Sequence, residues 1–270
     1  MPEGHALHRL ARRQSQQFGG QRVRVSSPQG RFGPEAALLD GLVFEGAQAW
    51  GKHLIYRLGD AGERLVHIHL GIYGAFTEES LPMPEPTGQI RLRMVGDDLG
   101  VDLRGPNACE LYTPEDLDAL IARLGPDPLR DDADPERAWR AISRSRRPIG
   151  SLLMDQKVIA GVGNIYRAEV LFRTGIEPMR PGTTITRGEF DAIWADLAEL
   201  MPIGMAKGRI HVVRPEDDHG APAYAPDRPR TYVYRRAGEA CRLCGTAVSW
   251  RELEGRNLFW CASCQSSAAG

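Results

Sequence analysis

The sequence predicts an α+β protein in several parts: an antiparallel β-sandwich or barrel with a leading helix, then a helical region, then a small metal-binding module. Three observations predict this order. Alternating apolar residues recur in the first third of the chain, helix-start signals cluster from residue 113 onward, and four of the five cysteines form two pairs near the end. We expect three parts at 1–112, 113–230 and 231–270, in a chain of 270 residues.

The first part begins with a predicted helix from Glu3 to Phe18. Pro2, just before it, stands where a first helical residue would lie. Apolar residues within this segment recur at helical spacing. Four strand patterns follow, in which apolar residues alternate with polar ones. They are Val23/Val25, Leu54/Tyr56/Leu58, Val66/Ile68/Leu70 and Ile90/Leu92/Met94.

The second part carries helix-capping signals. Thr113-Pro114 and Asp134-Pro135 each place a capping residue before a proline at the first helical position. Thr186 with Glu189 forms a capping-box pattern, and the apolar residues after it fall on one helix face. The polar, Gly- and Pro-rich segment 208–230 is interpreted as a long loop.

Charge and composition exclude some classes of protein. The formal net charge is −1, yet residues 97–137 carry −8, and residues 141–174 and 228–270 carry +4 each. This segregation fits a basic face for a polyanion, or ordinary scatter. No stretch approaches the roughly 20 apolar residues of a membrane span, and the first residues do not have the pattern of a secretion signal. We therefore expect neither a membrane protein nor an exported one.

The cysteine pairs Cys241-x2-Cys244 and Cys261-x2-Cys264 are 16 residues apart and predict one structural Zn²⁺ held by four thiolates. The segments between the pairs can form a hairpin whose turn is Glu254-Gly255. Arg256 would then lie beside the tip, either as a phosphate contact or as a solvated arginine. Cys109 is interpreted as a buried small hydrophobic residue.

A glycine-rich turn in the second part joins two predicted helices. Gly161 and Gly163 permit close backbone approach, and Asn164 is placed to cap the second helix. A helix start of this kind can hold a phosphate, with Lys157 nearby to assist, although a plain helix corner has the same pattern.

Taken together, the motifs resemble those of a known family. The chain is similar to the formamidopyrimidine-DNA glycosylase/endonuclease VIII family from Pro2 to Gln265, and most similar to its actinobacterial endonuclease VIII branch. The resemblance is carried by Pro2-Glu3-Gly4, Lys52 in Trp50-Gly51-Lys52-His53, Leu124-Gly125-Pro126-Asp127-Pro128-Leu129, Gly161-Val162-Gly163-Asn164 and the four cysteines, in that order.

The resemblance implies a base-excision-repair enzyme, a bifunctional DNA glycosylase and AP lyase. Its parts would be a β-sandwich, a helical domain with a helix–two-turns–helix motif, and a zinc finger. Its partner would be duplex DNA containing damaged bases or abasic sites, with the damaged nucleotide flipped out of the stack. A monomer in the bacterial cytoplasm, associated with the nucleoid when bound to DNA, is expected.

The resemblance also implies roles for individual residues. Pro2 would attack the sugar through its α-amine once Met1 is removed, and Glu3, in the first helical turn, would act as general acid and base. Lys52 would contact the phosphate beside the lesion and assist β-elimination. Asn164 and Arg256 would clamp a phosphate, and Arg256 is also linked to δ-elimination.

Further DNA contacts follow less directly. Arg123 and His69 match family contacts, although a lone histidine on a strand can equally be structural. Ile72 and Tyr73 would be the wedge and stacking ring that fill the gap left by the flipped nucleotide.

The lesion class rests on two departures from family patterns. Gly71 replaces a polar residue often found in the endonuclease VIII branch, which leaves the contact with the opposite base open. Residues 102–107 lack the phenylalanine of the purine-specific branch. We therefore expect oxidised pyrimidines such as thymine glycol as substrates. The alternatives are an enzyme for oxidised purines or bulky adducts, and a catalytically silent zinc-finger protein that binds damaged DNA.

Overall fold

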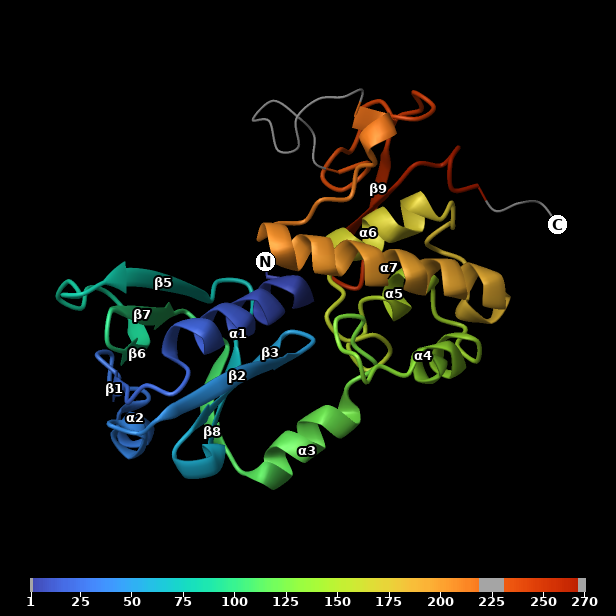
Figure 1. Ribbon diagram of the computed structural model, residues 1–270. Helices are drawn as coiled ribbons and strands as arrows, with labels where there is room; N and C mark the ends of the chain where they lie inside the picture. The colour runs from blue at the N-terminus through green and yellow to red at the C-terminus, as the bar shows by residue number, and fades with distance from the viewer. Residues whose placement is uncertain (1, 219–230, 267–270) are drawn as a thin grey trace. The chain divides into compact units, whose positions relative to one another are not determined.

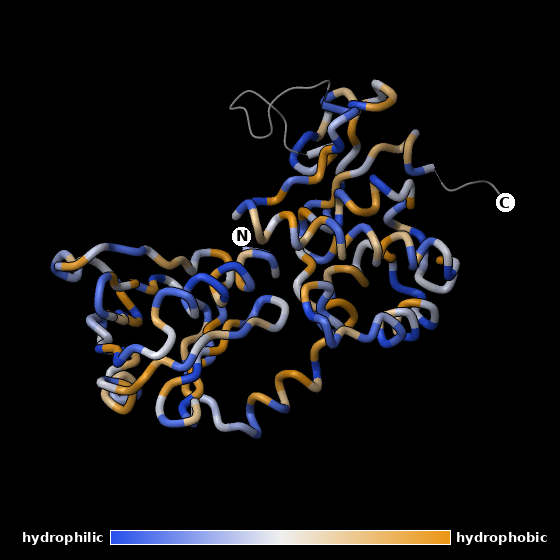
Figure 2. The backbone as a smooth tube through the Cα atoms, in the orientation of Figure 1, coloured by the Kyte–Doolittle hydropathy of each residue, from blue (hydrophilic) through white to orange (hydrophobic). Residues whose placement is uncertain are grey.

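The computed structural model describes residues 2–218 and 231–266 and divides the chain into two compact units, residues 1–123 and 124–270 (Figure 1). Hydrophobic residues recur along the strands and helices of both units, with hydrophilic residues between them (Figure 2). Among the described helices, none is both long and apolar enough to cross a membrane. The division into three parts at residues 112 and 230 stays a prediction.

The first unit is a sandwich of two four-stranded antiparallel sheets, which resolves the choice between sandwich and barrel. One sheet has the order β2-β3-β4-β8 and the other β1-β6-β7-β5. The strands are β1 Arg24–Ser26, β2 Phe44–Trp50, β3 His53–Leu58, β4 Arg64–His69, β5 Ala75–Ser80, β6 Ile90–Val95, β7 Leu99–Arg104 and β8 Ala108–Tyr112. Each of the four predicted strand patterns contributes to one of these strands.

The leading helix α1 runs from Gly4 to Phe18 and packs along β2. Its prediction is confirmed, but its start is corrected. Glu3 has an extended backbone (φ −109°, ψ 174°) and is the N-cap, so Pro2 lies outside the helix and Glu3 precedes the first turn. The hydroxyl of Ser15 accepts a hydrogen bond from the Ala47 N–H (2.8 Å), which fixes the helix on the strand.

The apolar core of the first unit lies between the two sheets and under α1. Phe18, Phe44 and Tyr56 meet edge to face, with ring centroids 6.0 and 5.2 Å apart. A second helix, α2 Gly33–Leu39, and the helix α3 Pro114–Arg123 complete the unit.

The second unit is helical, with a C-terminal hairpin. Its helices are α4 Pro135–Ile142, α5 Ile149–Leu152, α6 Asn164–Arg173 and α7 Arg187–Lys207, and its strands are β9 Ser249–Leu253 and β10 Arg256–Trp260. The predicted caps of α4 and α7 are confirmed, since Asp134 accepts from the Glu136 N–H and Thr186 forms a full capping box with Glu189. Within the predicted loop 208–230, Pro215–Asp218 forms a 3-10 turn, and residues 219–230 lie outside the described residues.

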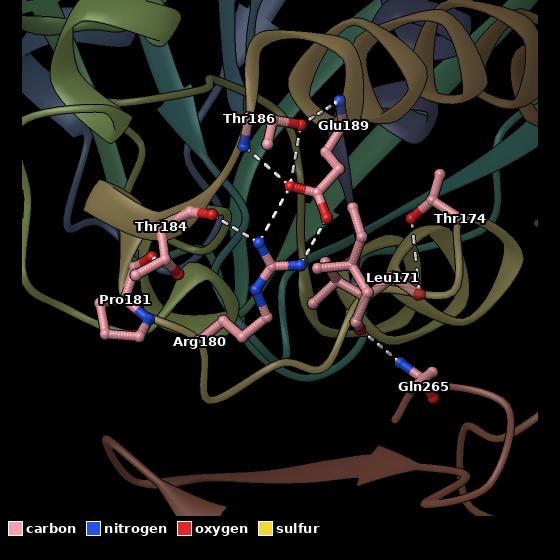
Figure 3. A network of polar contacts seen from close by, with 9 residues as sticks. Leu171, Thr174, Arg180, Pro181, Thr184, Thr186, Glu189 and Gln265 are labelled. Atoms are coloured by element: carbon pink, nitrogen blue, oxygen red, sulfur yellow. Dashed lines mark hydrogen bonds and ion pairs between the residues drawn. The ribbon is translucent and has the colours of Figure 1, made fainter. Parts of the chain in front are cut away.

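The start of α7 is held by a network of polar contacts (Figure 3). Arg180 forms an ion pair with Glu189 and donates to the Thr184 carbonyl. Glu189 also accepts from the Thr186 N–H at 2.8 Å. Arg180 lowers the pKa of Glu189, so the carboxylate stays charged at the positive end of the helix dipole.

The C-terminal hairpin and the helices share one hydrophobic core. Val248, Phe259 and the buried cysteines Cys241 and Cys261 pack in the same cluster as the apolar faces of α6 and α7. The hairpin is therefore a structural part of the second unit.

Candidate functional site

Lys52 lies in the tight turn between β2 and β3. Trp50 pairs with His53, so the turn has two residues, and Gly51 stands first with φ 57°. A glycine at this position suits a two-residue hairpin turn, because a side chain would strain the left-handed backbone. Lys52 is half-buried and lies at the end of the β2–β3 hairpin. The next residue, His53, pairs with His69 of β4.

The N-terminus of α1 lies at the same end of the sandwich as the β2–β3 turn (Figure 1). Ser15 meets Ala47, and Phe18 meets Phe44, so α1 and β2 run in opposite directions. From Ser15 back to the helix start is about 16 Å at 1.5 Å per residue. From Ala47 forward to the turn is a similar distance at 3.3 Å per residue. Glu3 is therefore level with the Lys52 turn.

The predicted catalytic residues of this unit differ in burial. Glu3 is only 1% exposed, whereas Pro2 and Lys52 are half-buried. A buried carboxylate requires partners, and Glu3 has them. The arrangement brings a secondary-amine residue, a buried acid and a lysine to one end of the first unit.

Beside this end lies a histidine cluster, His53, His67 and His69, which sequence reasoning found only in part. The His53 Nδ1 is 2.9 Å from the His67 Nε2, and the ring centroids of His53 and His69 are 4.9 Å apart. His67 also stacks on Tyr112 at 4.4 Å. Thus His69 is not a lone histidine on a strand.

The cluster is uncharged at neutral pH. Burial, with smaller contributions from the neighbouring rings and Arg123, lowers the pKa of His53 to about 3 and that of His67 to about 4. Burial, with a smaller effect of Lys52, also lowers the pKa of His69. Arg123, at the end of α3, is exposed, and its charge acts on both His53 and His67. His67 and His69 are two residues apart on one strand and so lie on the same side of the sheet, which is the sequence signal that could have indicated the cluster.

The loop 70–74 connects β4 with β5 and exposes two large apolar side chains. Ile72 is 49% exposed and Tyr73 is 84% exposed. The Gly74 N–H donates to the Leu70 carbonyl at 2.9 Å, which closes the loop into a tight turn. Adjacent exposed apolar residues on a closed loop indicate a binding surface rather than core.

In the second unit, the predicted capping role of Asn164 is wrong. Asn164 is the first residue of α6, and Gly163 is its N-cap. The Asn164 Nδ2 instead donates to the Asn257 carbonyl of β10 at 3.0 Å, and the buried Arg167 guanidinium contacts its Oδ1. Gly163 takes the extended cap conformation, and this leaves the amide of Asn164 to join helix and hairpin.

The turn before α6 is closely packed. A side chain at Gly125 would overlap the backbone of Val158, and the Gly161 N–H donates to the Gln156 side chain at 3.0 Å. Gly161 has φ 89°. Lys157 is exposed on this turn, so the predicted lysine lies at the surface near the start of α6.

The predicted hairpin turn Glu254-Gly255 is confirmed. Both residues have positive φ (50° and 72°), and Leu253 pairs with Arg256 across the turn. Arg256 is half-buried at the tip. Because Asn257 accepts the hydrogen bond of Asn164, the amide and the arginine are brought together by adjacent residues of β10.

The four cysteines form a candidate metal site. The sulfur atoms of Cys241, Cys244, Cys261 and Cys264 all lie within 4.8 Å of one another, and they could hold a metal ion. Four thiols at this separation, two of them buried, fit a closed tetrahedral ion with no open position. The Gln265 side chain accepts from the Cys261 N–H and donates to the Ile176 carbonyl, each at 2.9 Å, which ties the site to the helices.

A buried carboxylate, Glu169 on α6, holds the chain at residues 232–234. It is fully buried and accepts hydrogen bonds from the N–H groups of Tyr232 (2.6 Å), Val233 (3.0 Å) and Tyr234 (2.8 Å). Burial raises the pKa of Glu169, and the three N–H donors oppose that shift. These contacts make Glu169 a structural residue that fixes the chain at residues 232–234 against α6.

Comparison with known proteins identifies the family. Residues 1–106 match the formamidopyrimidine-DNA glycosylase N-terminal domain, and residues 124–214 match the formamidopyrimidine-DNA glycosylase H2TH domain. Endonuclease 8 1 of Mycobacterium tuberculosis is 58% identical over 270 residues, covering 98% of this chain and all of that protein. The chain belongs to the formamidopyrimidine-DNA glycosylase/endonuclease VIII family.

Other relatives agree with this membership in a family of DNA glycosylases and AP lyases. Endonuclease 8 2 of Mycobacterium bovis is 32% identical over 279 residues, covering 98% of this chain and all of that protein. The fold matches that of the Lactococcus lactis Fpg in complex with DNA containing an abasic site, with a TM-score of 0.81, 21% identity, and coverage of 98% of this chain and 100% of that one. The fold class and the family predicted from the sequence are thus confirmed.

Proposed function

We propose that this protein removes oxidised bases from duplex DNA and then cleaves the strand at the resulting abasic site. The observation that carries the proposal is the meeting of Pro2, Glu3 and the Lys52 turn at one end of the sandwich. Membership in the glycosylase/lyase family supports it.

Pro2 supplies the nucleophile once Met1 is removed. An α-amine has an ordinary pKa of about 7.7 to 8.0, so a useful fraction carries a free lone pair at neutral pH. That lone pair attacks the deoxyribose C1′, and the bond from C1′ to the base breaks with its electrons leaving on the base, which takes up a proton. Opening of the sugar ring, with protonation of O4′, gives an iminium between C1′ and the proline nitrogen.

Elimination follows from the iminium. Loss of a proton from C2′ sends electrons toward the iminium, and the bond from C3′ to its phosphate oxygen breaks; a second elimination releases the 5′ phosphate, and water frees the amine. Glu3 moves protons at the sugar ring and the departing base. Glu3 is nearly completely buried and adjoins Pro2 in the chain, so its carboxyl group would lie beside the reacting amine and away from solvent.

Phosphates are held by groups on both units. Lys52, His69 and Arg123 all lie near His53 and offer donors on the first unit. On the second unit, Asn164 offers the second N–H of its amide and Arg256 offers a guanidinium, with the exposed Lys157 on the turn before α6. We propose that Ile72 and Tyr73 enter the gap left by the extruded nucleotide.

One Zn²⁺ bound by the four cysteine thiolates would fix the hairpin that carries Arg256. Such a site supplies structure and no reactive position, since all four ligand positions are occupied by sulfur. The ion therefore acts on DNA binding only through the hairpin.

The proposed substrates are oxidised pyrimidines such as thymine glycol. The absence of phenylalanine from residues 102–107 supports this choice over 8-oxoguanine, and so does the 58% identity to an Endonuclease 8.

The test is borohydride trapping on a panel of duplexes containing thymine glycol, 8-oxoguanine, a bulky adduct or an abasic site. We expect covalent adducts on the abasic and thymine glycol duplexes, with at least a tenfold lower rate on 8-oxoguanine. Faster reaction with 8-oxoguanine or the adduct would assign the enzyme to those lesions. Binding to every duplex without any adduct would mean a catalytically silent DNA-binding protein.

A further inference from the structure

Two loops lie side by side at the proposed DNA-binding end of the first unit. Loop 70–74 leads from β4 to β5 and loop 105–107 from β7 to β8, so each loop crosses between the two sheets. Because β4 pairs with β8 and β5 pairs with β7, both crossings occur at the same end. This is the end where His69 pairs with Ala108.

The two loops interlock through glycine and asparagine. Gly71 has φ 67°, and a Cβ on it would overlap the side-chain amide of Asn107. The Asn107 N–H donates to the His69 carbonyl at 2.8 Å. On the other side, Gly105 has φ 59° and lies against Tyr73, since a Cβ there would be 3.3 Å from the Tyr73 carbonyl oxygen. The absence of a side chain at position 71 is what admits the Asn107 amide.

The Asn107 amide keeps its donors and acceptor for a ligand. Asn107 is exposed, and across residues 2–218 and 231–266 its side chain forms no hydrogen bond. Its backbone N–H is already occupied by His69, which fixes the position of the residue. The Asn107 amide therefore lies against Gly71, the residue that precedes the exposed pair Ile72 and Tyr73.

We infer that Asn107 is a specificity-determining residue whose carboxamide contacts the base opposite the extruded nucleotide. This inference rests on the proposed function, in which Ile72 and Tyr73 enter the stack. Side chains that fill the space left by the extruded nucleotide lie against the base that has lost its partner. A polar group beside those side chains would therefore meet the edge of this base. A carboxamide carries a neighbouring donor and acceptor, and at the base edge that carries N6 and N7 it pairs in two-point fashion with adenine above all. Adenine is the partner of thymine, so the contact suits an enzyme for oxidised thymine.

The test measures strand cleavage of abasic duplexes with adenine, cytosine, guanine or thymine opposite the site. The wild-type chain is expected to cleave fastest opposite adenine, by roughly tenfold over the slowest partner. Asn107→Ala should bring the four rates to within about twofold, by slowing the reaction opposite adenine. Asn107→Asp keeps the shape but loses the donor, and it should lose the same preference. Asp98→Ala, in the exposed turn at the opposite end of the sandwich, is the matched control and should keep the wild-type ranking.

Two results would overturn the inference. One is the same preference for adenine in the cleavage rates of wild type and Asn107→Ala. The other is a wild-type cleavage rate that does not depend on the opposite base. Either result leaves the proposed function standing, because cleavage still occurs. Absence of cleavage and of trapping on all four duplexes would instead refute the proposed function. Gly71→Ala provides a second route to the same answer, because its methyl group would displace the Asn107 amide and should abolish the preference for adenine.

Discussion

The two units hold their proposed DNA contacts by different means. In the first unit, Lys52, His69 and Ile72 stand on turns and strand ends that the sandwich itself fixes through sheet pairing. In the second, Asn164 is held by side-chain contacts with Asn257 of β10 and with Arg167, and β10 is tied to the helices by the cysteine site and Gln265. Loss of a single group should therefore disturb the second unit far more than the first.

The largest effect is expected from removing the metal. Structural zinc contributes on the order of 10 kcal/mol in small modules of this kind. We expect chelation to loosen the β9–β10 hairpin and weaken DNA binding, because the cysteines share the core of α6 and α7. The first unit should keep its structure, since its core is a separate cluster. Hydrogen exchange of the strand amides of both units distinguishes local loosening from global unfolding, and equal loss of protection in both units would contradict the comparison.

The next effect concerns the buried carboxylate. Glu169→Gln leaves N–H donors of residues 232–234 without a good acceptor, because an amide carries only one acceptor oxygen. Each buried unsatisfied donor costs about 1 to 3 kcal/mol, so the variant should lose about 2 to 4 kcal/mol in urea unfolding. Glu199→Gln, an exposed position on α7, is the control and should change stability little. Equal stability of the two variants would show that Glu169 does not brace this segment.

A pH effect should be specific to the first unit. The pKa values of His53 and His67 fall to about 3 and 4 in the folded chain, against 6.5 unfolded. Between pH 6.5 and 4 the unfolded chain therefore binds more protons, and stability falls as the pH falls, by at most about 1.4 kcal/mol per pH unit for each histidine. His53→Gln/His67→Gln should show a shallower decline in the urea midpoint between pH 7 and 5. The same slope in wild type and variant would show that the histidine cluster does not cause the pH dependence of stability. Glu110, whose carboxylate is 3.9 Å from the His67 ring, would then be the next residue to substitute.

The smallest effect is expected at the tip of the β9–β10 hairpin. Arg147 forms ion pairs with Asp155 and Glu254, but the Arg147 and Glu254 side chains are about half exposed. Exposed pairs contribute roughly 0 to 1 kcal/mol, so Glu254→Gln should shift the urea midpoint of the second unit only slightly. A loss as large as that of Glu169→Gln would mean that the hairpin depends on this surface contact rather than on the cysteine site.

The sequence predicted the parts of the site that depend on local rules. Alternation indicated β3, β4 and β6, capping signals fixed the starts of α4 and α7, and cysteine spacing predicted the metal site. Strand β2 was missed because its small and polar residues, Gly46 and Gln48 among them, weaken the alternation.

The rest depends on contacts between distant segments. The bond from Asn164 to Asn257 spans 93 positions and that from Gln265 to Ile176 spans 89, so no local pattern indicates them. The overlap of Gly71 with Asn107 likewise requires the pairing of β4 with β8. The assignment of Pro2, Glu3 and Lys52 to one site came from the family resemblance, since no local pattern in the sequence joins these residues, and it stays a prediction.

Peptide mapping of the borohydride-reduced complex tests the central claim most directly. After reduction on abasic duplex DNA and proteolysis, mass spectrometry should find the deoxyribose remnant on the N-terminal peptide that begins at Pro2. A Pro2→Gln chain, in which Met1 is expected to stay attached, should form at least a hundredfold less adduct. An adduct on Lys52 or on any other residue, or undiminished trapping by the Pro2→Gln chain, would contradict the claim that the proline amine bonds to the sugar.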